Sequence, residues 1–150
     1  MKNPPPELHG PGDTVGDIVY FSRMVSKIRL HHAGNLPEDL RENLGLGFDG
    51  RCVHFLRISY QGLCDQVREV GASASDEELL TWCFTNGRQP DDDEIEVWND
   101  FMRKRGWKDA ATPTLERRKK ESGLADRADI ETMFQYIDAD EGRPVRPVDA

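Results

Sequence analysis

The sequence predicts an all-α fold, a compact single-domain bundle of about seven or eight short helices. Three observations indicate this: recurrent helix-capping residues, apolar residues at three- and four-residue spacing, and glycines that end the resulting segments. No stretch alternates apolar and polar residues as a strand does, so we expect no strand longer than an isolated bridge. A chain of 150 residues can bury one core without disulfides or metal.

Composition divides the chain into three parts. Residues 1–16 are rich in Pro and Gly and are expected to form an extended arm. Residues 17–142 hold the helical patterns and are expected to form the domain itself. Residues 143–150 contain two prolines and are expected to form a short tail. No linker or internal repeat interrupts the central part.

The first half of the helical domain contains a series of helix starts. Asp17 is placed to cap a helix that runs to Ala33, and a short helix is expected after Pro37. Asp49 and Ser59 are placed to cap the next two helices. The expected apolar face of the first helix consists of Ile18, Phe21, Val25, Ile28 and His32.

The second half continues the same pattern. Ser75 and Glu78 form a capping box, in which each side chain bonds the backbone N–H of the other residue. Asp91–Glu94 place carboxylates in a first turn, where the helix dipole favours negative charge. Trp107 is expected to fold back on the end of that helix. Two further helices are expected, one capped by Thr112 before Pro113 and a last one starting near Asp126 with Ile130, Phe134 and Ile137.

Charge and cysteine usage exclude several function classes. The net charge of -8 argues against binding to nucleic acid or to an anionic membrane surface, since both require a basic surface. No apolar stretch is long enough for a signal peptide or a membrane span. The basic run at residues 117–120 is expected to face an acidic segment of the same chain or solvent. Three widely spaced cysteines are typical of reduced thiols in a cytoplasmic protein.

Six segments of the chain are unusually composed: Asn35–Asp39, Gly47–Cys52, Trp98–Asn99, Phe101–Trp107, Asp129–Ile130 and Asp138–Arg143. With these segments the chain resembles a bacterial domain of unknown function, the DUF5069 family. The resemblance extends from about residue 14 to 143 and implies a compact helical domain. It implies no activity and identifies no functional residue.

Two motifs resemble ligand sites only in their letters. Gly45, Gly47 and Gly50 match the G-x-G-x-x-G dinucleotide fingerprint, but a polar helical stretch precedes them where that mechanism needs a strand. We therefore interpret them as a link between two helices. The loop that starts at Asp138 resembles a calcium loop, yet its glycine falls at position 5 and Asp149 at position 12, which is not the EF-hand pattern.

No spacing of histidines and cysteines predicts a metal site or a catalytic pair. Cys52 and His54 are two residues apart and point to different sides of a helix. His31 and His32 are adjacent and cannot both face one metal ion from a regular helix, whereas zinc needs three or four converging ligands. We expect no metal and no cofactor.

The most informative pattern is a stripe of Arg23, Lys27 and His31 at four-residue spacing. Like charges at this spacing destabilise an isolated helix slightly, so an acceptor of negative charge is expected nearby. One hypothesis supplies it from Asp91–Glu96 or Asp138–Glu141 of the same chain, and Lys27→Ala then lowers stability by about 1 kcal/mol or less, as at an exposed pair. The other makes the three residues an anion-binding site for a phosphate or carboxylate ligand.

Function is not determined by these patterns, and three hypotheses follow. The first is a non-catalytic cytoplasmic domain that binds or regulates a protein partner or a small anionic ligand. The second is a small enzyme acting on an anionic metabolite, with Arg23, Lys27 and His31 as the anion clamp and the source of an acid. The third is a homodimer. A cavity that contains His31 beside a carboxylate would favour the enzyme, and an exposed apolar patch would favour binding.

Overall fold

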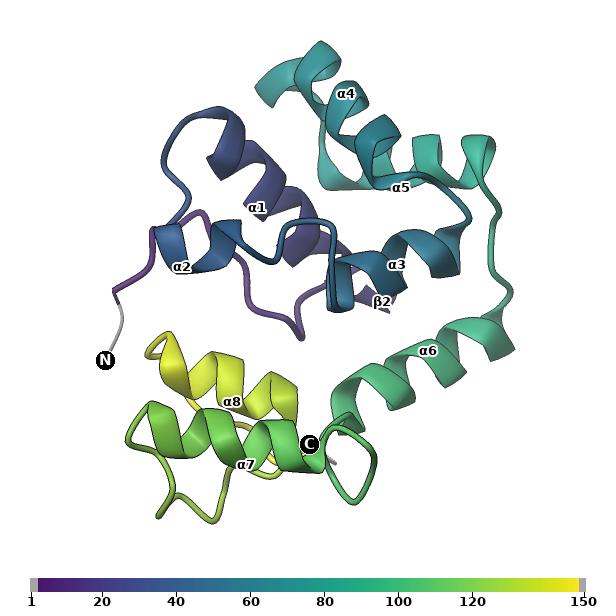
Figure 1. Ribbon diagram of the computed structural model, residues 1–150. Helices are drawn as coiled ribbons and strands as arrows, with labels where there is room; N and C mark the ends of the chain where they lie inside the picture. The colour runs from purple at the N-terminus through teal and green to yellow at the C-terminus, as the bar shows by residue number, and fades with distance from the viewer. Residues whose placement is uncertain (1–2, 149–150) are drawn as a thin grey trace.

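The computed structural model describes residues 3–148. Within these residues it has a small hairpin followed by eight α-helices and one 3₁₀ turn (Figure 1). The elements are β1 Thr14–Val15, β2 Ile18–Val19, α1 Phe21–His32, α2 Glu38–Arg41, α3 Phe48–Leu56, α4 Tyr60–Val70, η1 Gly71–Ser73, α5 Asp76–Asn86, α6 Asp92–Lys104, α7 Thr112–Glu121 and α8 Met133–Asp140. The predicted helical single-domain fold is confirmed.

Helix α1 lies at the centre of the molecule. It contacts the hairpin, α4 and α5, while α6 packs on β2 and α8. Helices α7 and α8 lie side by side below α1 to α3 (Figure 1). Nine of the twelve residues of α1 are buried, including two cations, Arg23 and Lys27. These charges must therefore be compensated inside the protein.

The core consists of one large cluster and two smaller ones. The large cluster contains side chains from the hairpin, from α1 and from each of the helices α3, α4, α5 and α6. Its almost fully buried members include Phe21, Met24, Ile28, Leu56, Leu63, Leu79 and Met102. A second cluster lies between α7 and α8 and consists of Leu115, Ile130, Met133, Tyr136 and Ala139. The third packs Leu8 against Leu30 and Leu36. Leu8 lies in the segment expected to be an arm, so that segment contributes to the core. Residues 149–150 of the expected tail lie outside the described residues.

The hairpin corrects the expectation of no strand beyond an isolated bridge. Thr14 pairs with Val19 and Val15 with Ile18 in antiparallel register. The turn residues Gly16 and Asp17 both have positive φ, as a two-residue type I′ turn requires. Two-residue strands are too short to show alternation, which is why the sequence pattern missed them. Asp17 is consequently a turn residue and not the cap of α1, which begins at Phe21.

Side chains of α6 hold the outer edge of this hairpin. The Asn99 amide accepts a hydrogen bond from the backbone N–H of Val19 at 3.1 Å and donates to the carbonyl of Asp17 at 2.7 Å. The Trp98 indole donates to the carbonyl of Val19 at 3.1 Å. The edge groups of the hairpin are thereby satisfied without further strands.

Two of the predicted caps are confirmed, and the structure adds a third. Ser59 caps α4 by accepting from the backbone N–H of Gly62. Ser75 and Glu78 form the expected capping box at the start of α5. Asp91 forms a second box with Glu94 and so caps α6 instead of lying in its first turn. Each interaction spans only three residues, so the local sequence is sufficient to predict it.

Three other local expectations are wrong. Asp49 lies inside the first turn of α3 and is fully buried, so it is not a cap. Thr112 is the first residue of α7 and its hydroxyl bonds the Gly106 carbonyl. The last helix begins after Thr132, which forms a capping box with Gln135, and not near Asp126. Trp107 donates its backbone N–H to the Lys104 carbonyl at the end of α6, while its side chain is 48% exposed.

We expect Ser75→Ala to destabilise the protein by about 1 kcal/mol, because it removes the N-cap of α5. Urea unfolding followed by circular dichroism measures the difference. Thr81→Ala on the exposed face of the same helix is the control, since it leaves the cap intact. An unchanged midpoint for Ser75→Ala would mean that the capping box contributes nothing.

Candidate functional site

Two of the three stripe residues line a cavity of about 520 Å³. We call it the polar cavity. It lies between α1, the segment from α2 to α3, and the adjoining parts of α7 and α8. Its lining includes Tyr20, Arg23, Lys27, Asn43, Arg118 and Tyr136.

Arg23 forms a bidentate ion pair with Glu141 at the end of α8. Its two terminal nitrogens donate to the two carboxylate oxygens at 2.9 Å and 2.7 Å. Arg143 donates to the same carboxylate at 2.6 Å. Burial alone would raise the pKa of Glu141, but the hydrogen bonds and charges of the two arginines hold it below its ordinary value. Glu141 belongs to one of the acidic groups expected to face the stripe.

Lys27 pairs with Asp49, a carboxylate that the sequence suggested only as a cap. The ammonium donates to Asp49 Oδ1 at 2.9 Å and to the Tyr20 hydroxyl at 3.2 Å, and that hydroxyl donates to Asp49 at 2.7 Å. Burial lowers the pKa of Lys27, and the charge of Asp49 partly offsets this. Burial and Asp49 raise the pKa of Tyr20 well above its ordinary value, so its hydroxyl keeps the proton that it donates.

The glycine-rich segment has a structural role in this cluster. The backbone N–H of Gly45 donates to Asp49 Oδ2 at 3.0 Å, so the loop binds a carboxylate of its own chain. Gly45 has a φ of 76°, and a Cβ there would lie 2.9 Å from the Tyr60 ring. Only glycine fits this position without strain. The interpretation of the motif as a link between helices agrees with the absence of a strand in the residues that precede it, 20–44.

His31 is separate from this cluster. It is exposed in the last turn of α1 and does not line the polar cavity. The structure therefore brings Arg23 and Lys27 together and leaves His31 outside.

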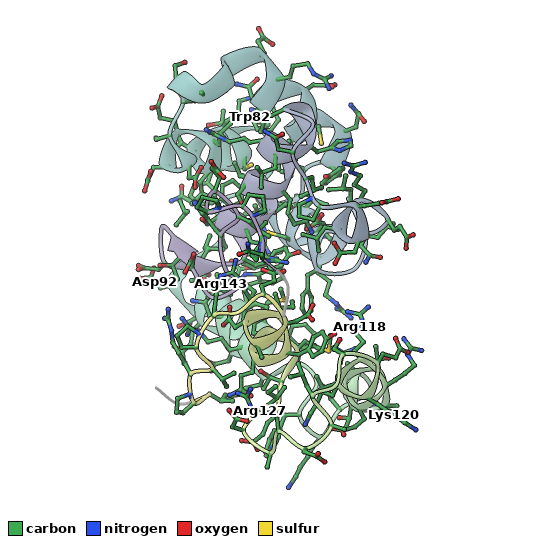
Figure 2. The ribbon with its side chains drawn as sticks, turned by 90° about the vertical axis from the view of Figure 1, so that its left-hand side faces the viewer. Trp82, Asp92, Arg118, Lys120, Arg127 and Arg143 are labelled. Atoms are coloured by element: carbon green, nitrogen blue, oxygen red, sulfur yellow. The ribbon has the colours of Figure 1, made fainter. Side chains whose placement is uncertain are left out.

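Arg118 is a cavity residue that the sequence stripe did not indicate. It lies on the side of α7 that faces the rest of the molecule, whereas Lys120 lies on the far side (Figure 2). Its neighbours in the basic run differ in role: Arg117 pairs with Glu121 at 3.5 Å, and the buried Lys119 donates to the carbonyls of residues 127 and 130. Only the tertiary structure distinguishes these four residues.

A second cavity, of about 530 Å³, opens between α3 and α6. We call it the apolar groove. Phe55 and Trp98 stack at 4.6 Å in its wall, and Val97 and Phe101 are 70% and 39% exposed. Exposed apolar side chains that lie together in a groove are one of the features of a binding surface.

Three arginines and two carboxylates, Asp93 and Glu94, lie at the apolar groove. Arg88 lies over the Phe55 ring and pairs with Glu94, and Arg51 lies over the Phe101 ring at 5.0 Å. Arg57 donates to the ring of His54 at 3.2 Å. Within residues 3–148, no carboxylate pairs with Arg51 or Arg57.

The described residues offer no group of three or more His, Cys, Asp or Glu side chains that could hold a metal ion. The three cysteines are free, and Cys52 and Cys83 are buried. Burial raises the pKa of Cys83 to about 12 and also raises the pKa of Cys52, so neither is a reactive thiolate. No helix in this part of the chain is long and apolar enough to cross a membrane.

A family profile described as "Domain of unknown function (DUF5069)" matches residues 6–143. The chain belongs to the DUF5069 family. No curated protein matches it. The segments that carried the resemblance hold structural contacts of this DUF5069 domain: Asp49 lies in Gly47–Cys52, Glu141 lies in Asp138–Arg143, and Trp98–Asn99 bind the hairpin. Membership of the family supplies no activity.

We expect Lys27→Met to destabilise the protein by about 3–5 kcal/mol, because it leaves the Asp49 carboxylate buried without its cation. Lys27 is only 5% exposed, so this replaces the smaller loss expected for an exposed pair. Urea unfolding in low and high salt measures the loss, which should depend little on salt. The double variant Lys27→Met/Asp49→Leu should recover much of it, and exposed Lys120→Met is the control. A loss under about 1 kcal/mol would contradict the pairing.

The Arg23–Glu141 pair predicts a specific pH dependence. The pKa of Glu141 is lower in the folded protein than in the unfolded chain. The ionised carboxylate therefore contributes its full share of the unfolding free energy above the unfolded-state pKa, and this contribution is lost as the pH falls through the folded-state pKa. Glu141→Gln should therefore destabilise strongly at pH 7 and progressively less toward pH 3. Urea unfolding across this range, with exposed Glu116→Gln as control, tests it. A difference that stays constant with pH would refute the assignment.

Proposed function

We propose that this DUF5069 domain is a non-catalytic binding domain, and that the apolar groove takes an acidic amphipathic helix of a protein partner. The observation that carries the proposal is the groove itself, in which exposed apolar side chains of α6 lie between arginines of α3 and the α5–α6 loop. Helices bind such grooves through apolar residues at i, i+3, i+4 and i+7.

The charges at the groove favour an acidic helix. Arg51 and Arg57 have no carboxylate partner among residues 3–148, so a partner's Asp or Glu can pair with them without displacing an internal ion pair. Because the whole chain carries a charge of -8, these arginines act at short range. They would orient the bound helix more than attract it from a distance.

The alternative, a small enzyme acting on an anionic metabolite, has less support. It requires His31 at the ligand together with Arg23 and Lys27. His31 lines neither the polar cavity nor the apolar groove, and the two cations of α1 already bind carboxylates. We also propose a bacterial cytoplasmic location, which the three free thiols support.

A fluorescence anisotropy titration tests the proposal with a labelled synthetic helix that carries Leu at i, i+3, i+4 and i+7 and Glu on its other faces. Val97→Asp should weaken binding at least about tenfold, since it places a charge in the groove, and should leave stability within about 0.5 kcal/mol because Val97 is largely exposed. Leu46→Asp, also exposed but outside the groove, is the matched control.

Four outcomes would contradict the proposal. The first is that the wild type does not bind the acidic helix, and the second is that Val97→Asp binds it as tightly as the wild type does. The third is equally tight binding of a helix with Lys in place of Glu, which would remove the role of the arginines. The fourth is a homodimer in sedimentation that Val97→Asp dissociates, which would make a second copy of this chain the occupant of the groove.

A further inference from the structure

The charges that line the polar cavity are unequally compensated. Arg23 is neutralised by Glu141 and Lys27 by Asp49. Glu121 pairs with Arg117, while Asp39 and Asp140 are engaged in interactions of their own. Among the residues that the structure describes, Arg118 has no ion-pair or side-chain hydrogen-bond partner, whereas the other two cations of the cavity are paired.

The position of Arg118 is only partly explained by the helix that carries it. The helix dipole favours a cation in the last turn of α7. Lys120 also lies in that turn and interacts with the dipole in the same way, although its side chain lies on the side of α7 away from the rest of the molecule. The dipole does not account for a half-buried guanidinium that lies against a cavity. A planar guanidinium is instead suited to bind a carboxylate or phosphate through two parallel hydrogen bonds.

Further polar groups in the cavity suit hydroxyls. The ammonium of Lys27 donates two of its three protons within the described protein, which leaves one for a ligand. Tyr136 and Ser122 share a hydrogen bond at the cavity wall, and each oxygen keeps a lone pair that can accept another. A volume of about 520 Å³ lies within the range of small-molecule sites.

We propose that the polar cavity binds a small hydroxylated molecule carrying one carboxylate or phosphate, with Arg118 as the residue that contacts the anionic group. This site is separate from the apolar groove, and it revises the earlier anion hypothesis. Arg23 and Lys27 shape the site, but their charges are used internally, and the free cation comes from α7.

Thermal unfolding and isothermal titration calorimetry with glucose 6-phosphate, gluconate and glucose, at constant ionic strength in chloride, test the proposal. All three probes are six-carbon polyhydroxylated molecules, gluconate in open-chain form, and they carry a phosphate, a carboxylate or no charge. Arg118→Gln removes the proposed contact, and Lys120→Gln removes a neighbouring exposed charge on the far side of α7, outside the cavity. We expect the phosphate, the carboxylate or both to raise the melting temperature of the wild type and of Lys120→Gln by several degrees. Arg118→Gln should bind at least about tenfold more weakly, and glucose should have no effect.

The results distinguish a phosphate site from a carboxylate site, and they test the polar cavity independently of the apolar groove. Stabilisation by glucose 6-phosphate alone assigns the site to phosphates, and stabilisation by gluconate alone assigns it to carboxylates. The site is overturned if neither anion stabilises the wild type, if glucose stabilises it as much, or if Arg118→Gln responds as Lys120→Gln does. Val97→Asp should keep the full response, so failure of the groove proposal would leave this result unchanged.

Discussion

The fold depends on the burial of two cations in helix α1. A helix with nine of twelve residues inside the protein cannot leave Arg23 and Lys27 unpaired, because an isolated buried charge costs several kcal/mol. Each cation is therefore matched by an acid far away in the sequence: Glu141 is 118 residues from Arg23, and Asp49 is 22 residues from Lys27. These two pairs fix α8 and α3 against the central helix.

Such pairs contribute more to the uniqueness of the arrangement than to its net stability. Desolvation offsets much of the attraction in a buried ion pair. Apolar residues of similar volume in the same place often give a protein that is equally stable. Any shift of α3 along α1, however, would separate Lys27 from Asp49 and leave both charges inside the core. Tyr20 adds to this constraint, since it takes a positive φ of 77° at the start of α1 and its hydroxyl joins the same cluster. Backbone strain of this kind persists only where the surroundings determine it fully.

The sequence predicted what is local and missed what is tertiary. Ser59 and Ser75 act within three residues of their own position, and their capping roles follow from spacing. Asp49 has the same local signature as a cap, but its carboxylate bonds Lys27 and Tyr20 from inside a helix. The stripe of Arg23 and Lys27 was correctly seen to need negative charge. The free cation of the cavity was not found, because four adjacent basic residues of α7 differ only in what they face.

Helix α3 connects the two candidate sites, and its attachment determines how they can influence each other. Arg51 and Phe55 lie one turn apart on its groove side, while Phe48 lines the polar cavity. A ligand at one site could alter the other by sliding α3, but that movement would break the buried pair of Lys27 and Asp49 at a cost of about 3–5 kcal/mol. Allosteric coupling energies are typically about 1–3 kcal/mol, which is too small to drive it. We therefore expect α3 to act as a rigid wall between two sites that bind independently.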